Sequence, residues 1–260
     1  MKEFFGWGGY TREAEGFLSW QHLLFVTSLM AAMVMLAILF GRKNRNADDA
    51  QKNRVLVVAA ISIDAIELFK IVIMCLRSQD PLLWRYELPL FLCSIQLIAI
   101  PIAAFSKGRM KQAAMDFVLI FGILGAVMGT YGAGQNYGCY PVLGFDNVVS
   151  GVTHSIAGFT SLYLGITGMA RMQKKNIPIT FGVLFGFAAA ALLANHLLDY
   201  NYMFLVRGDG TPYEIVYSLV GGHPILYPIF VIFLFLVYIL AFYGVYFMVR
   251  AKKAKKTSGM

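Results

Sequence analysis

One cysteine and two histidines are the residues of this sequence best suited to covalent chemistry. Cys93 lies in ELPLFLCSIQ, His154 in GVTHSIAGF and His196 in LLANHLLDYNYMFL. A thiolate beside an imidazole is a nucleophile with its own base, and it can carry an acyl group as a thioester. An isolated cysteine or histidine is more often a packing residue. Three such groups on three apolar segments instead predict a catalytic site formed by Cys93, His154 and His196.

Three ionisable residues share a different apolar segment. Asp64, Glu67 and Lys70 are spaced three residues apart, so they follow one side of a helix. Ionisable groups within hydrocarbon are costly unless they are paired or wetted, and they often mark functional sites. Two interpretations stay open: a self-neutralised stripe that packs this helix against its neighbours, or ligands in a pocket.

Ionisable and neutral polar side chains on the same apolar segments are predicted to bind substrate. The residues predicted to bind substrate are Asp64, Glu67, Lys70, Gln96, Asn195, Asp199 and Asn201. The chain has no CxxC pair and no HExxH motif, so neither a metal nor another cofactor is predicted. The alternative is a metal held by His154, His196 and Glu67, which would form an acceptable three-ligand set if they met. His22, beside Trp20, is interpreted as an interfacial residue, and His223 as a surface turn residue.

Composition predicts that these residues lie within a lipid bilayer. The 260-residue chain is 58% hydrophobic and 14% charged, with a mean hydropathy of +0.65, which is more apolar surface than one soluble core can bury. Its net charge of +8 is concentrated in short clusters between apolar runs. We therefore predict an all-α polytopic membrane protein, a single transmembrane domain over residues 1–260, with no nucleic-acid partner.

Apolar runs long enough to cross a bilayer, about 20 residues each, recur about seven times. They are predicted at roughly 20–41, 55–77, 88–106, 114–133, 147–170, 178–200 and 224–249. Basic clusters follow the first, third, fifth and last runs, whereas the other loops are rich in tyrosine and poor in lysine and arginine. This positive-inside pattern predicts an external N-terminus and a cytoplasmic C-terminus.

The predicted topology brings the candidate residues to similar depths. At about 1.5 Å per residue, the cysteine, both histidines, Gln96, Glu67 and Lys70 all lie about 6–15 Å below the outer ends of their runs. The cytoplasmic halves of the same runs are nearly free of ionisable side chains. We therefore expect a polar cavity that opens toward the outer leaflet.

Several classes of membrane protein do not fit the sequence. The last apolar run contains no lysine for a retinal Schiff base, and the chain has no Pro-Gln dipeptide of the kind found in PQ-loop carriers. Walker and GxSxG motifs are also absent from the sequence, so it does not indicate an ordinary nucleotide or serine-hydrolase site.

The strings ELPLFLCSIQ and ANHLLDYNYMFL, together with His154, resemble the bacterial YwaF-like integral membrane family over nearly the whole chain. That family is similar in turn to a eukaryotic membrane acyltransferase of ether phospholipids, and more remotely to androgen-induced hydrolases of fatty-acid esters. The resemblance implies a bacterial plasma-membrane location, Cys93 as the acyl-accepting nucleophile, and His154 or His196 as its base. Phe91 stands where the family usually has histidine, and the eukaryotic cysteine aligns nearer Leu90.

Two functions follow as hypotheses. The first is a lipid-modifying enzyme that performs acyl transfer or ester hydrolysis in the outer leaflet, with membrane lipids as its partners. The second is an outward-facing lipid or small-molecule binding or transport protein that uses Asp64, Glu67 and Lys70. A protein partner and the oligomeric state are left open by the sequence, and a packing-only role for the polar residues is the remaining alternative.

Overall fold

The computed structural model describes residues 1–258, which form helices and connecting loops without a β-strand in that range. The helices pack as two compact units, residues 1–170 and 171–260, which are considered separately below. The sequence prediction treated the chain as one membrane domain, and its last residues, Gly259 and Met260, lie outside the described residues.

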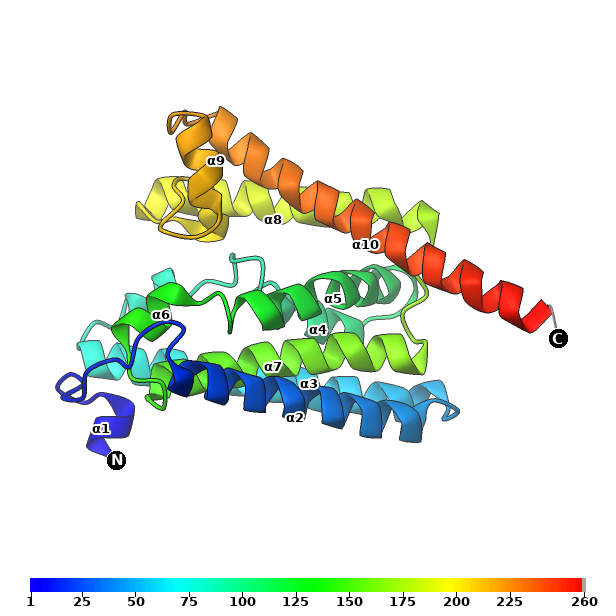
Figure 1. Cartoon of the computed structure of the whole chain (residues 1–260), viewed down its shortest axis with the longest axis horizontal. Coiled ribbons are helices and arrows are strands. Elements are labelled where there is room, and N and C mark those ends of the chain that lie inside the picture. Colours follow the sequence, from blue (N-terminus) through cyan, green and yellow to red (C-terminus); the bar gives the residue numbers. More distant parts are fainter. Residues whose placement is uncertain (259–260) are drawn as a thin grey trace. The chain divides into compact units, whose positions relative to one another are not determined.

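The first unit is a bundle of long antiparallel helices (Figure 1). Its elements are α1 (Lys2–Phe5), α2 (Trp20–Asn44), α3 (Asp49–Ser78), η1 (Leu83–Tyr86), α4 (Gln96–Phe105), α5 (Gly108–Met128), α6 (Gly134–Cys139) and α7 (Phe145–Thr167). Polar caps fix two of the starts. Ser19 Oγ accepts the His22 N–H at 3.2 Å, and Asp48 accepts the Gln51 N–H at 2.6 Å, which satisfies amides that have no partner within the helix.

Helix α7 is the centre of the first unit, because α2, α3 and α5 all pack against it. Small residues allow the close approach. A Cβ added to Gly122 of α5 would lie 2.7 Å from the Ala157 carbonyl oxygen of α7, and the Ser161 hydroxyl donates to the Leu119 carbonyl at 2.7 Å. Close packing of small residues with an interhelical hydrogen bond is typical of membrane helices.

The third apolar run departs from its predicted helix. The sequence predicts a helix from about residue 88 to 106, but α4 begins only at Gln96 and has 10 residues. Pro89 disfavours a helical Leu88, and the Leu90 N–H donates instead to the Leu88 carbonyl at 2.7 Å. At about 1.5 Å per residue, α4 covers about half of a hydrocarbon core. Cys93 therefore lies in the non-helical stretch that leads into this short helix.

The second unit contains η2 (Lys174–Asn176), α8 (Ile177–Leu198), η3 (Tyr202–Phe204), α9 (Tyr213–Leu219) and α10 (Leu226–Ser258). Helices α8 and α10 contact each other, and the Thr180 and Tyr243 hydroxyls lie 3.1 Å apart across that contact. A compact loop joins α8 to α9. Its left-handed residues include Asp199 (φ 49°) and Met203 (φ 55°).

Four helices are long and apolar enough to cross a membrane: Trp20–Asn44, Gly108–Met128, Lys174–Leu198 and Leu226–Lys252. Together with the helical content, they confirm the prediction of an all-helical membrane protein. The remaining predicted crossings correspond to α3, to the short α4 and to α7.

Candidate active site

The structure brings Cys93 and His154 together. The thiol precedes α4 and the imidazole projects from α7, and the two side chains are close enough to interact electrostatically. Both residues are partly buried, so the pair is shielded yet not closed off. Two of the three predicted catalytic residues therefore meet, although 61 positions separate them in the sequence.

A backbone contact determines which nitrogen of His154 is free to act as a base. His154 Nδ1 lies 2.7 Å from the Ser150 carbonyl oxygen, one turn earlier in α7. A carbonyl only accepts, so Nδ1 must carry the proton and donate it. In the neutral imidazole, Nε2 is then the unprotonated nitrogen and can take a proton from Cys93. The same logic orients the imidazole in other nucleophile–histidine pairs.

Two glycines, Gly125 in α5 and Gly129 directly after it, make room for the pair. A Cβ added to Gly125 would lie 3.3 Å from Cys93 Cβ, and one added to Gly129 would lie 2.0 Å from His154 Nε2. Real Cβ atoms do not approach that closely, so a side chain at position 129 would have to displace the imidazole. Gly125 and Gly129 form a GxxxG pattern, which brings membrane helices into close contact.

The turn before α4 adds polar groups around the thiol. The Ser94 hydroxyl also interacts with the Cys93 side chain. Gln96, the first residue of α4, is 0% exposed, and both polar atoms of its amide lack a partner among the described residues. The start of a helix carries partial positive charge, which favours a thiolate placed there.

The ionisable residues of α3 form a separate charged group next to this pair. Lys70 Nζ lies 2.5 Å from Glu67 and 3.0 Å from Glu87, which follows η1. The charge of Glu67 also interacts with His154 and with Asp64. Asp64 Oδ1 is buried without a hydrogen-bond partner among the described residues. The group is thus only partly neutralised, since Lys70 pairs with Glu67 and Glu87 and the Asp64 carboxylate has no cation paired with it among the described residues.

The N-terminal segment is held by an ion pair at one end of the bundle. Arg77 donates to both Asp146 oxygens at 2.7 and 2.8 Å, and the Tyr10 hydroxyl donates to the same carboxylate at 2.7 Å. Burial by itself raises the pKa of Asp146, but the Arg77 and Tyr10 hydrogen bonds outweigh it and lower that pKa. Burial and the bond to Asp146 raise the pKa of Tyr10 to about 12.

The predicted site residues of the second unit have different surroundings. His196 and Asp199 are exposed at the end of α8. Asn195 accepts the Tyr202 N–H at 2.6 Å and donates to the Tyr202 carbonyl at 3.1 Å. Asn201 donates to the Arg207 carbonyl at 2.8 Å and accepts the Val206 N–H at 2.9 Å. Both asparagines therefore hold the loop after α8 in its fold.

His22 does not lie at the interface as expected. It is 0% exposed, and its ring packs against that of Tyr137 at a tilt of 31° with centroids 3.9 Å apart. Its Nδ1 accepts the Leu18 N–H at 3.1 Å, so Nε2 is the nitrogen that donates to the Thr130 carbonyl, also at 3.1 Å. Packing against Tyr137 covers the ring, and these two hydrogen bonds satisfy its nitrogens. His223 is exposed in a turn, as predicted.

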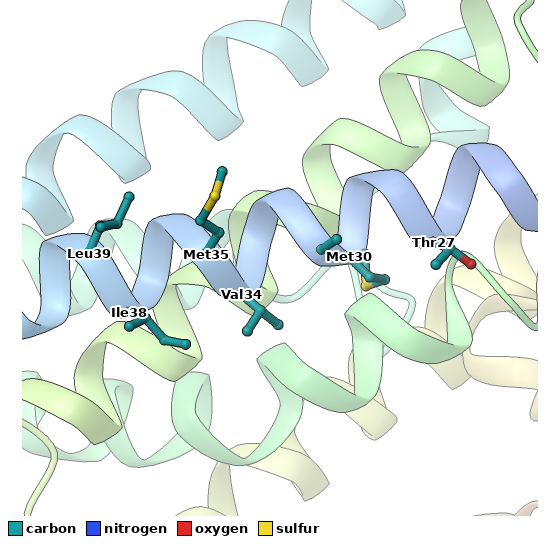
Figure 2. A pocket seen from close by; sticks show the side chains of 7 residues that line it. Thr27, Met30, Val34, Met35, Ile38 and Leu39 are labelled. Atoms are coloured by element: carbon teal, nitrogen blue, oxygen red, sulfur yellow. The ribbon is translucent and has the colours of Figure 1, made fainter.

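Other potential sites carry less chemistry. Among residues 1–258, no cluster of three His, Cys, Asp or Glu side chains could hold a metal ion. Figure 2 shows a groove along α2 whose lining is apolar apart from Thr27. Its residues are Thr27, Met30, Ala31, Val34, Met35, Ile38 and Leu39. None of them can act as an acid, base or strong nucleophile, so the groove is a surface for hydrocarbon contact.

Comparison with protein families places the chain. A family model described as the TMEM164 family matches residues 17–255. The chain belongs to the TMEM164 family. Neither the curated proteins nor the solved structures gave a match. The TMEM164-family match covers Cys93, His154, Gly125 and Gly129. Most of the N-terminal segment next to the Arg77–Asp146 ion pair precedes the matched residues.

Several residues of this TMEM164-family site escape sequence reasoning. From the sequence, Glu87 belongs to an external loop. Its pairing with Lys70 depends on the path of η1, which the sequence does not reveal. Ser150 contributes a backbone carbonyl, which no side-chain pattern reveals. Gly125 and Gly129 do have a signal, since GILGAVMG contains a GxxxG spacing within an apolar run.

Proposed function

We propose that this membrane protein transfers acyl groups between lipids, or hydrolyses lipid esters, with Cys93 as the nucleophile and His154 as its base. One observation carries the proposal. The thiol interacts electrostatically with a histidine whose Nδ1 donates to the Ser150 carbonyl at 2.7 Å. A nucleophile, a base and a group that orients the base are the minimal requirements of covalent acyl transfer.

The first half of the reaction forms a thioester. Cys93 gives its proton to His154 Nε2 while its sulfur bonds to the ester carbonyl carbon, and the C=O π electrons move onto the carbonyl oxygen. The intermediate then collapses and breaks the bond from carbon to the alcohol oxygen, which takes the proton from His154. The products are acyl-Cys93 and a lysolipid or another alcohol.

The second half releases the acyl group. An acceptor hydroxyl from a second lysolipid gives its proton to His154 as its oxygen bonds to the thioester carbon. The Cys93 sulfur leaves and recovers that proton, which restores the starting state. Water in place of the lysolipid gives hydrolysis by the same steps. During both halves, the nearby Glu67 charge would stabilise the transient imidazolium.

Location and topology follow from the charge distribution. We propose about seven crossings, with α3, α4 and α7 added to the four long apolar helices, and an external N-terminus in a bacterial plasma membrane. In the first unit, the α2–α3 loop, the basic start of α5 and the end of α7 lie at one end (Figure 1). The clustering of Arg42, Lys52 and Lys111 there supports a cytoplasmic assignment, which leaves Cys93 toward the outer leaflet.

Lipids are proposed as substrates because ELPLFLCSIQ resembles the YwaF-like family, which is distantly similar in turn to an acyltransferase of ether phospholipids. The apolar groove on α2 (Figure 2) fits the same surroundings, since acyl chains can pack against its methionine and aliphatic side chains. His196 stays a predicted second base.

Intact-protein mass spectrometry of membrane-extracted protein tests the proposal. The wild-type chain is expected to carry a fatty-acyl adduct that hydroxylamine removes, because hydroxylamine cleaves thioesters. Cys93→Ala should lose the adduct, whereas the matched controls Cys75→Ala and Cys139→Ala should keep it. An adduct that persists in Cys93→Ala would contradict Cys93 as the acyl carrier.

A binding or transport function is the second candidate, and Asp64 is the observation that favours it. Its buried Oδ1 has no partner among the described residues, so a cationic or hydroxylated ligand could occupy it. This function predicts that a ligand protects Cys93 from alkylation without forming a thioester, and that Asp64→Asn weakens the protection.

A further inference from the structure

Gln96 is a buried amide whose hydrogen-bonding capacity is unused. Its side chain is 0% exposed, and neither Nε2 nor Oε1 has a partner among the described residues. A buried amide without partners destabilises a fold, so such groups are rare and call for an explanation. The reaction proposed above does not use this residue.

The backbone directs Gln96 toward the side of the chain that carries Cys93. The Gln96 N–H donates to the Cys93 carbonyl at 3.3 Å, and the next two amides donate to Ser94 and Ile95, each at 3.0 Å. These are hydrogen bonds to the third preceding residue. In that geometry the side chains of residues three apart are nearly eclipsed, so the amide and the thiol leave the turn on the same side.

Few other buried side-chain atoms of the first unit lack a hydrogen-bond partner among the described residues. The buried side-chain atoms without a partner among the described residues are Asp64 Oδ1, Asn147 Oδ1, Tyr227 Oη and the two Gln96 atoms. Asp64 and Asn147 offer acceptor oxygens, and Tyr227 belongs to the second unit. Gln96 Nε2 is thus the unused N–H donor of this set in the first unit.

We propose that Gln96 is a catalytic residue that binds the carbonyl oxygen of the acyl group. When Cys93 attacks the carbonyl carbon, the π electrons move onto oxygen, and a Gln96 Nε2–H donates to that oxyanion. No proton is transferred in this contact, and the bond is released when the carbonyl re-forms. A donor aimed at developing negative charge in a water-poor site is among the strongest catalytic effects. This inference rests on the proposed function, because it requires acylation at Cys93.

The test compares two reactions of the same thiol in the full chain, with Cys75 and Cys139 replaced by alanine. Acylation by p-nitrophenyl butyrate passes through an oxyanion, whereas alkylation by iodoacetamide does not. Gln96→Met is expected to slow acylation about 10²–10³-fold and to leave alkylation within about two-fold. Its melting temperature should equal or exceed that of the parent, because an unpartnered amide is replaced by an apolar side chain of similar size.

Tyr227→Phe is the matched control, since it also removes a buried polar group without a described partner, and its acylation rate should not change. Equal acylation in Gln96→Met and the parent would overturn the inference while leaving the proposed function intact. Parallel loss of acylation, alkylation and melting temperature would overturn it in favour of a structural role. A parent thiol that is alkylated but never acylated would overturn both the inference and the proposed function.

Discussion

Gln96 and Asn195 are both buried amides on helices with apolar surroundings, but they use their hydrogen bonds differently. Asn195 pairs both side-chain polar atoms with the Tyr202 backbone, at 2.6 and 3.1 Å. Gln96 pairs neither of them with a described residue. Asn195 is therefore committed to the fold of a loop, whereas Gln96 has capacity left for a ligand. Whether an amide has protein partners thus separates a structural role from a functional one better than burial does.

The largest expected effect lies at His154, beside Cys93. His154→Gln should slow acylation of Cys93 about 10²–10⁴-fold, because glutamine cannot accept the thiol proton. The measurement is the rate of p-nitrophenyl butyrate hydrolysis by purified protein. His223→Gln, which changes an exposed turn histidine, should retain the rate. An equal loss in His196→Gln would contradict the assignment of His154, rather than His196, as the principal base.

Gly129→Ala sharpens the same contrast without touching a polar group. Its Cβ would lie 2.0 Å from His154 Nε2, so the imidazole must move, and a shift of about 1 Å can cost about 10²-fold in rate. Gly186→Ala in α8 is the matched control, because nothing lies within 4 Å of its added Cβ. Comparable rates for the two alanine variants would show that His154 does not depend on Gly129.

Asn195→Ala should have the opposite signature, with lower stability and an unchanged reaction. The buried Tyr202 N–H and carbonyl would lose their partners, at a cost of about 1–3 kcal/mol. Thermal melting in detergent measures the loss, and the rate of hydrolysis per folded molecule should stay at the wild-type value. Asp199→Asn, at an exposed left-handed position that asparagine tolerates, should not lower the melting temperature. A stable but inactive Asn195→Ala would break the comparison.

The smallest effect is expected at the N-terminal clasp, which is the Arg77–Asp146 ion pair together with the Tyr10 hydroxyl. Asp146 has a lowered pKa, so its ion pair contributes stability above the ordinary aspartate pKa, and this contribution is lost as the pH falls through the lowered pKa. Tyr10, with its pKa raised to about 12, extends the contribution until the pH rises through that value. The clasp should therefore be intact at neutral pH.

Asp146→Asn should accelerate proteolysis of residues 1–16 about five-fold at pH 7, if about 1 kcal/mol of local stability is lost. Hydrogen exchange of the same residues, which does not depend on a protease, should show the difference vanish as the pH is lowered below about 3.9. A difference that persists undiminished in acid would exclude ionised Asp146 as its source.

The sequence predicts the helices better than the site. Apolar runs and basic loops predict α2, α5, α8 and α10 with little error, because hydropathy reports length directly. The predicted start of the third helix, near residue 88, is wrong. Proline at position 89 is compatible both with the first turn of a helix and with an extended segment before a helix. The left-handed conformation of Met203 has no comparable signal, so the loop role of Asn195 and Asn201 could not be predicted.

The meeting of Cys93 and His154 was predicted only as a shared depth. Depth follows from topology, but neighbours follow from the order of helices in the bundle, which hydropathy does not contain. The same limit applies to Glu87, whose approach to Lys70 depends on a turn between helices. For His22, the nearby Trp20 suggested an interface, whereas the burying partner, Tyr137, is 115 positions away.

The close approach of α5 to His154 also restricts how the chain can evolve. An alanine cannot become fixed at position 129 while the imidazole stays where it is, so the histidine must be lost or moved first. Among relatives, a glycine at 129 should accompany a histidine at 154, and lineages that abandoned the chemistry should show side chains at 129 at random. The residue at position 129 would then mark which relatives keep the histidine in this place.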